Sequence, residues 1–161
     1  MTDPHSPMLT GDQALWGVVL ALHLLGVVVW VGGMAYALLI LRPSLGLLDA
    51  TPRMNVHLQT LRRFLKMVWH VMPIVLITGW LMLVFKEGGP ALAPWFVNTM
   101  QGIGVIMAAI FVWMFSVPYK RLRRAIRPTP AQLAAVRLPV LVNLVLGTVV
   151  IIVAALGHFP A

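Results

Sequence analysis

The chain has 161 residues, of which 60% are hydrophobic and only 10% are charged, against about 25% charged residues in an ordinary soluble domain. It contains no cysteine, which excludes disulfides, thiolate metal sites, cysteine-held iron–sulfur clusters and covalent c-type haem attachment. The net charge of +8 is concentrated in two short segments, and this distribution argues against nucleic-acid binding.

The first of four long uncharged runs predicts a membrane span over about 15–40. A transmembrane helix needs roughly 20 apolar residues to cross about 30 Å of hydrocarbon. His23 is the exception within this run. An imidazole in hydrocarbon is costly unless it faces the bundle interior and has a partner, so His23 is a candidate functional residue.

A mostly polar loop is expected over 48–60, followed by a second span over about 65–86. Pro73 predicts a kink in this span close to His70, because proline cannot donate a backbone hydrogen bond. The third span is expected over about 97–118.

The fourth span is expected over about 138–158, with Pro139 in its first turn, where a missing N–H is tolerated. Before it, "RPTP" breaks a basic segment, and "AQLAAVR" is expected to form a short surface helix.

Lysine and arginine gather in the connections between the first and second spans and between the third and fourth. Basic loops stay in the cytoplasm, so we expect a multi-pass protein of the inner (cytoplasmic) membrane with both termini outside. The N-terminus lacks a basic region, and no cleaved signal peptide is expected. We predict one domain over 1–161, an all-α, up-down four-helix bundle. Small residues are expected to let its helices approach closely: Gly26, Gly32, Gly33, Gly102, Gly104 and Gly147.

Two histidines are candidate metal ligands. His23 shares a helix face with Trp30, and His70 shares one with Arg63 and Lys66. A haem needs an imidazole for its iron and cations for its propionates, and His70 with Arg63 and Lys66 supplies both. The alternative for His23 is a hydrogen bond to a neighbouring helix, and for the cations a role as membrane anchors.

The expected heights of the two histidines differ by about 10 Å, at 1.5 Å per residue. Helix tilt or the Pro73 kink would have to close this gap for both to bind one iron. A different partner for one histidine, or two haems, are the alternatives.

Other polar residues have simpler interpretations. His5 and His57 are expected in solvated loops, and His158 at the outer face, where a partly hydrated histidine needs no special reason and is of interest only as an outer ligand near His23. Asn98, Gln101 and Asn143 are expected to bridge helices by hydrogen bonds. The four acids lie in end segments or loops, which excludes a Ser-His-Asp hydrolase: Asp3, Asp12, Asp49 and Glu87.

Methionines in the spans suggest copper as an alternative, since thioether sulfur suits Cu(I). Met100, Met107 and Met114 recur every seven residues and share a face, but no tight M-x-x-M pair occurs within a span. Methionine also fills irregular cores.

Three segments resemble the CopD and HemJ-like membrane proteins. "HLLGVVVWVGG", with His23, Trp30 and Gly33, resembles their first span, and "LRRFLK" with the later "ITGWLML" is similar to their second. "RLPVLVNLVLG", with Asn143, looks like the start of their fourth. The resemblance implies a helical membrane protein, with b-type haem and protoporphyrinogen oxidation in the HemJ branch and copper handling in the CopD branch. The HemJ pattern has a lysine near the start of its third span, where this chain offers Asn98 or Gln101.

The leading prediction is a membrane-embedded b-type haem protein, carrying out electron transfer or a haem-dependent oxidoreductase reaction. Its axial ligands would be His23 and His70, its propionate partners Arg63 and Lys66, and its pocket wall Trp30 and Gly26. The partners would be the lipid bilayer and a quinone or redox protein; a homo-oligomer is compatible with the sequence. The alternatives are a copper transport or uptake protein and a non-catalytic membrane subunit.

Overall fold

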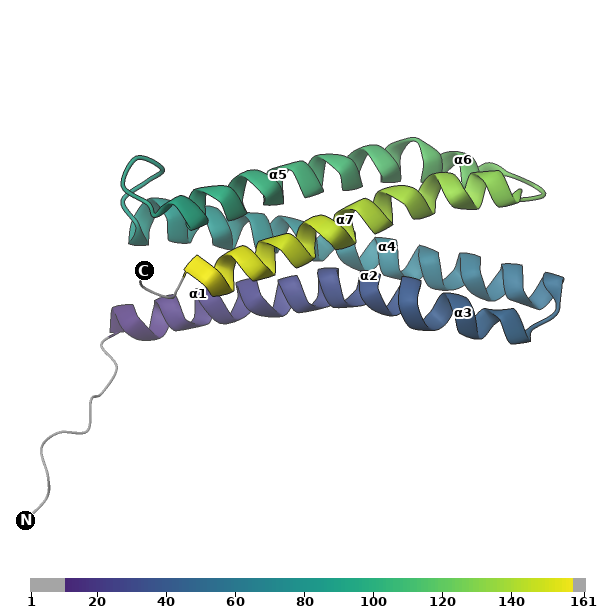
Figure 1. Cartoon of the computed structure of the whole chain (residues 1–161), viewed down its shortest axis with the longest axis horizontal. Coiled ribbons are helices and arrows are strands. Elements are labelled where there is room, and N and C mark those ends of the chain that lie inside the picture. Colours follow the sequence, from purple (N-terminus) through teal and green to yellow (C-terminus); the bar gives the residue numbers. More distant parts are fainter. Residues whose placement is uncertain (1–10, 158–161) are drawn as a thin grey trace, which may run out of the picture.

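The computed structural model describes residues 11–157, and all regular structure in this range is helical. Four helical segments, each long and apolar enough to cross a membrane, run antiparallel to one another along the molecule (Figure 1). They comprise Gly11–Leu47, Ala50–Lys86, Trp95–Arg124 and Pro130–Gly157. The predicted all-α membrane bundle is confirmed.

The first segment is one continuous helix in which α-helical and π-helical turns alternate, and a 3₁₀ turn ends it. Its elements are α1 (Gly11–Val27), η1 (Val28–Gly32), α2 (Gly33–Ala35), η2 (Tyr36–Leu41), α3 (Arg42–Ser44) and η3 (Leu45–Leu47). Trp30 in the first π turn and Met34 directly after it are both buried. Such single π turns inside α-helices often occur at functional sites.

The second segment consists of α4 (Ala50–Leu81) and η4 (Met82–Lys86), so the expected loop over 48–60 is wrong. Leu58 and Leu61, spaced one turn apart, pack against the core and extend the helix as an amphipathic one. A helix of 37 residues is about 55 Å long, against about 30 Å of hydrocarbon. The polar N-terminal turns of α4 therefore project beyond the membrane core.

The short connection after η4 turns on two glycines. Gly88 and Gly89 have φ angles of 77° and 99°, in the left-handed region that only glycine adopts without strain. The N–H of Gly89 donates to the carbonyl of Leu83 at 2.9 Å. This turn brings the third segment back antiparallel to the second (Figure 1).

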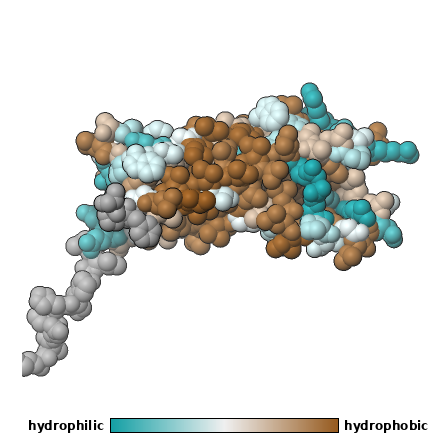
Figure 2. All heavy atoms as spheres, viewed as in Figure 1, coloured by the Kyte–Doolittle hydropathy of each residue, from teal (hydrophilic) through white to brown (hydrophobic). Residues whose placement is uncertain are grey.

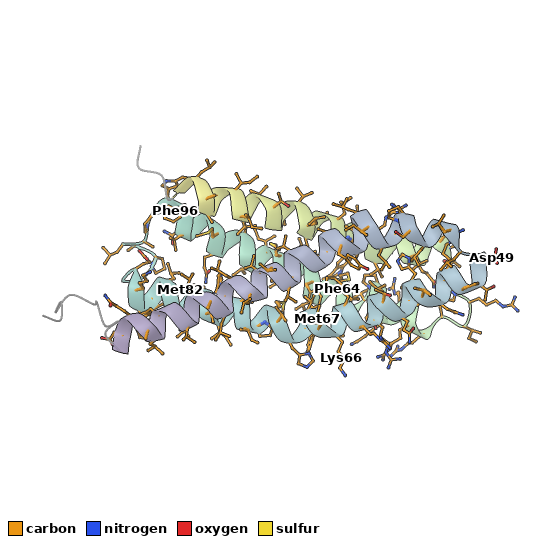
Figure 3. All side chains as sticks on the ribbon, turned by 90° about the horizontal axis from the view of Figure 1, so that it is seen from below. Asp49, Phe64, Lys66, Met67, Met82 and Phe96 are labelled. Carbon is orange, nitrogen blue, oxygen red and sulfur yellow. The ribbon has the colours of Figure 1, made fainter. Side chains whose placement is uncertain are left out.

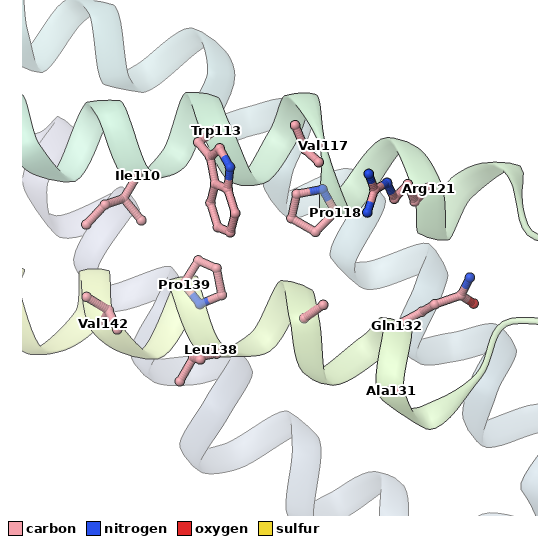
Figure 4. A pocket seen from close by; sticks show the side chains of 11 residues that line it. Ile110, Trp113, Val117, Pro118, Arg121, Ala131, Gln132, Leu138, Pro139 and Val142 are labelled. Carbon is pink, nitrogen blue, oxygen red and sulfur yellow. The ribbon is translucent and has the colours of Figure 1, made fainter.

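The third segment breaks at Val117 into α5 (Trp95–Ser116) and α6 (Pro118–Arg124), and the fourth is a single helix, α7 (Pro130–Gly157). Two predictions are wrong here: "AQLAAVR" is the start of α7, and Pro139 lies inside the helix. Because Pro139 has no N–H, it leaves the carbonyl of Ala135 without its helical partner. Both residues line an apolar groove of about 730 Å³, together with Trp113 and Pro118 (Figure 4).

All four segments contribute to the core, with α1 packed along α4 and α5 along α7. Three of the six expected glycine contacts are present: Gly26 faces Val75, Gly33 faces Phe64, and Gly147 faces Val31 and Met107. The other three are wrong, because nothing lies within 4 Å of a Cβ built at Gly32, Gly102 or Gly104.

The outer surface of the bundle is apolar. Figure 2 shows a wide hydrophobic belt between hydrophilic residues at the two ends of the bundle, with more of them at the right-hand end. Leu25 and Leu39 are 63% and 68% exposed, which suits contact with lipid and not with water. The chain is a multi-pass membrane protein.

Candidate functional site

His23 lies between α1 and α4 and is held through its Nδ1 atom. Nδ1 is 3.0 Å from the carbonyl oxygen of Val75 and 3.0 Å from Oγ1 of Thr78. Because a carbonyl oxygen only accepts, Nδ1 carries the proton and donates it. The neutral ring then keeps its lone pair on Nε2. A metal-binding histidine is held in this way, with one ring N–H on a backbone oxygen and the other nitrogen free to ligate.

Space for the imidazole comes from Gly79. A Cβ at this position would lie 3.2 Å from Cε1 of His23 and 3.0 Å from the nearest atom of the Gln101 amide group, tighter than ordinary contact. Gln101, on α5, also lies beside Trp80: with its amide oxygen turned that way, it accepts from the indole Nε1 at 3.0 Å. The His23 site is therefore formed by three helical segments.

Two buried polar atoms have no hydrogen-bond partner in the described range, Nε1 of Trp30 and Oδ1 of Asn143. Trp30 is 3% exposed and packs edge-to-face on Phe111, with ring centroids 6.3 Å apart. Asn143 uses its amide nitrogen to donate to the carbonyl of Met107 at 3.0 Å, which bridges α7 and α5 as predicted. An unpaired buried donor or acceptor costs about 1–3 kcal/mol, so the core keeps these two polar groups at a cost in stability.

Four methionines are buried in the core cluster that also contains Trp30. They come from three of the four segments: Met34, Met72, Met107 and Met114. The remaining described methionines lie outside this cluster and are not buried: Met54, Met67, Met82 and Met100. No three His, Cys, Asp or Glu side chains of residues 11–157 come together as a metal site. Thioethers are thus the most numerous soft donors inside the bundle.

The six residues predicted to bind haem divide into two groups. His23, Gly26 and Trp30 lie in or near the interior, whereas Arg63, Lys66 and His70 are exposed on the outer face of α4. The Nδ1 atom of His70 lies 2.7 Å from the carbonyl oxygen of Lys66 on its own helix. Figure 3 shows the side chain of Lys66 directed away from the bundle.

Arg63, Lys66 and His70 are exposed because other residues form the buried face of α4. That face carries Leu65, Val68, Met72, Val75 and Thr78. Residues 63, 66 and 70 do share a helix face, but it is the one turned outward. The structure therefore does not bring His70 to His23, and a haem shared between the two is not formed by this arrangement.

The positions of His57 and Asn98 also differ from those expected from the sequence. His57 is not in a solvated loop: it lies half-buried on α4 and lines a basic cavity. Asn98 binds the carbonyls of Pro90 and Ala93 in the connection before α5, and does not bridge two spans. His5 and His158 lie outside the described residues. Thr78 and Gly79 were missed as neighbours of His23, although both stand in the quoted "ITGWLML" segment.

The comparison with protein families gives one match. Residues 58–156 match the family model CopD, copper resistance protein D, and this is more than half of the chain. The chain belongs to the CopD family. No curated protein matches it, and no solved structure does. The matched range includes three of the four buried methionines, Gly79 and Asn143, and begins after His23.

Proposed function

We propose that this CopD-family protein moves copper through the membrane and holds Cu(I) as cargo on the buried thioethers and His23. The observation that carries the proposal is that four buried methionines from three segments belong to the core cluster of the bundle. Cu(I) is a soft ion and prefers thioether and imidazole donors. Copper handling is also what the family description names.

Neutral donors suit a cargo site. Every acid in the described range lies at a segment end or in a connection, at positions 12, 49 and 87, so no carboxylate lies in the core to trap the cation. An ion in transit must bind well enough to lose its water and weakly enough to leave. The unpaired Oδ1 of Asn143 offers an additional oxygen next to the backbone of Met107, to which the amide nitrogen of Asn143 donates.

We also propose an orientation of the protein in the membrane. The basic end of the bundle would face the cytoplasm and both termini the outside, in an inner membrane, because positive connections are retained on the cytoplasmic side.

The test is a Cu(I) titration of purified protein in lipid nanodiscs against a colorimetric chelator. The variant M34L/M72L/M107L/M114L removes the four buried sulfur atoms and keeps apolar side chains of similar volume. Its matched control, M54L/M67L/M82L/M100L, makes four identical changes outside the cluster. We expect the first variant to lose stoichiometric copper and the control to keep it. Equal binding in both, or no copper bound by the unaltered protein, would contradict the proposal.

A b-type haem protein is the second candidate, because the held imidazole of His23 is also suited to be an axial ligand. His70 lies on the outside, so this candidate needs a different second ligand or a single ligand. It predicts a Soret band after haem-supplemented expression that H23A abolishes and H70A leaves unchanged. A colourless preparation that binds copper decides for the cargo function.

A further inference from the structure

A second site lies at the basic end of the bundle, away from the methionine cluster. Here a cavity of about 410 Å³ is enclosed by the end of the first segment, the projecting part of α4 and the start of α7. Its lining carries three arginines and one histidine: Arg42, Arg53, Arg137 and His57. No carboxylate is among its lining residues within 11–157, although Asp49 stands nearby at the start of α4.

One of the three arginines has a structural task. Nε and Nη2 of Arg53 donate to the carbonyl of Leu48 at 3.1 Å and 2.7 Å, and Nη2 also donates to that of Gly46 at 3.2 Å. These bonds fix the turn between the first two segments, which forms one wall of the cavity. The side chains of Arg42 and Arg137 make no hydrogen bond with the described part of the chain, so their guanidinium groups are free for a ligand.

The pKa of His57 responds to the positive charges of both Arg42 and Arg137. This histidine lies in the projecting part of α4, outside the expected span over 65–86. Burial lowers the pKa of His57, and the positive charges of Arg42 and Arg137 lower it further. At pH 7 the ring is therefore neutral, and two uncompensated cations from two other segments stand beside it. Arg62 and Arg123 belong to the same basic end and are exposed, as Arg42 and Arg137 are, but they do not line the cavity.

We infer that this cavity binds a phosphate-bearing anion between Arg42 and Arg137, with His57 as a hydrogen-bond partner. Guanidinium groups bind phosphate oxygens by charge-assisted hydrogen bonds, about twice as strong as neutral ones. The source favoured by position is the headgroup of an anionic phospholipid, because Arg42 and Arg137 stand next to the expected span ends at 40 and 138. Basic pockets between membrane helices bind such headgroups. This inference does not depend on the copper proposal.

The experiment compares two double variants with the same loss of charge. R42Q/R137Q removes the two free cavity arginines, and R62Q/R123Q removes two exposed arginines outside it. Full-length protein would be presented with phosphatidylglycerol and phosphatidylcholine in mixed micelles, and bound lipid counted by native mass spectrometry. Inorganic phosphate alone would be titrated in a parallel arm. Circular dichroism would check folding, and R42K/R137K, which keeps both charges, would serve if the glutamine variant unfolds.

We expect phosphatidylglycerol to bind at least tenfold more weakly to R42Q/R137Q than to the unaltered protein, and less than twofold more weakly to R62Q/R123Q. Phosphatidylcholine should not distinguish the variants. If inorganic phosphate binds with the same dependence on Arg42 and Arg137 while phosphatidylglycerol does not, the site takes a free anion. If both double variants lose binding equally, or neither does, there is no phosphate site in the cavity.

Discussion

Gly79→Val tests the geometry at His23. The added Cβ would lie 3.2 Å from Cε1 of His23 and 3.0 Å from the nearest atom of the Gln101 amide group, where an alanine would already require shifts of a few tenths of an ångström. The two methyl groups of valine extend about 1.5 Å further, so the imidazole must leave its place against α4. Overpacking of this kind costs about 1–3 kcal/mol, and a lost hydrogen bond in a membrane protein adds about 0.6 kcal/mol.

Gly102→Val is the matched control, because Gly102 also lies inside a helix and nothing lies within 4 Å of its Cβ position. Both changes alter helix propensity in the same way, so the difference between them isolates the packing at His23. Thermal unfolding in detergent, followed by circular dichroism, should show G79V melting about 3–14 °C below G102V, at roughly 2–4 °C per kcal/mol. Equal melting temperatures would refute the described position of the imidazole.

Two of the remaining predictions concern stability and one concerns copper binding. Asn143→Leu should leave the free energy of unfolding unchanged or raise it by about 1 kcal/mol, since it loses one hydrogen bond to Met107 but removes a buried unpaired oxygen. Chemical unfolding in mixed micelles measures this free energy. A clear destabilisation would mean that Oδ1 has a partner in the membrane. Asn98→Leu should instead destabilise by about 1 kcal/mol, because the bonds to Pro90 and Ala93 hold the connection before α5. His23→Ala should weaken Cu(I) binding at least tenfold and His70→Ala less than twofold in the chelator titration; the reverse order would contradict the assignment of His23.

The four membrane spans could be predicted from the sequence because the hydrocarbon core of a membrane imposes a simple requirement on composition. Each span must be long and almost free of charge, and the four uncharged runs met that condition. The segment ends were not predictable in the same way. The polar stretch after Ala50 continues as a helix because Leu58 and Leu61 find a core to pack on, and this depends on the other segments.

The candidate site was predicted in part for a related reason. Spacing showed that Arg63, Lys66 and His70 share a face of one helix, but spacing along a single helix does not say which face turns inward. The buried side of α4 is set by contacts with α1 and α5, which no local pattern records. Gly79 could have been noticed as a small residue beside a tryptophan in "ITGWLML". Its contact with His23, more than fifty positions earlier, could not.

The most direct test of the copper proposal is X-ray absorption at the copper edge on Cu(I)-loaded protein in nanodiscs. The proposal predicts at least two sulfur atoms among the copper ligands, and their loss in M34L/M72L/M107L/M114L but not in M54L/M67L/M82L/M100L. A copper site with only nitrogen and oxygen neighbours, identical in both variants, would contradict it.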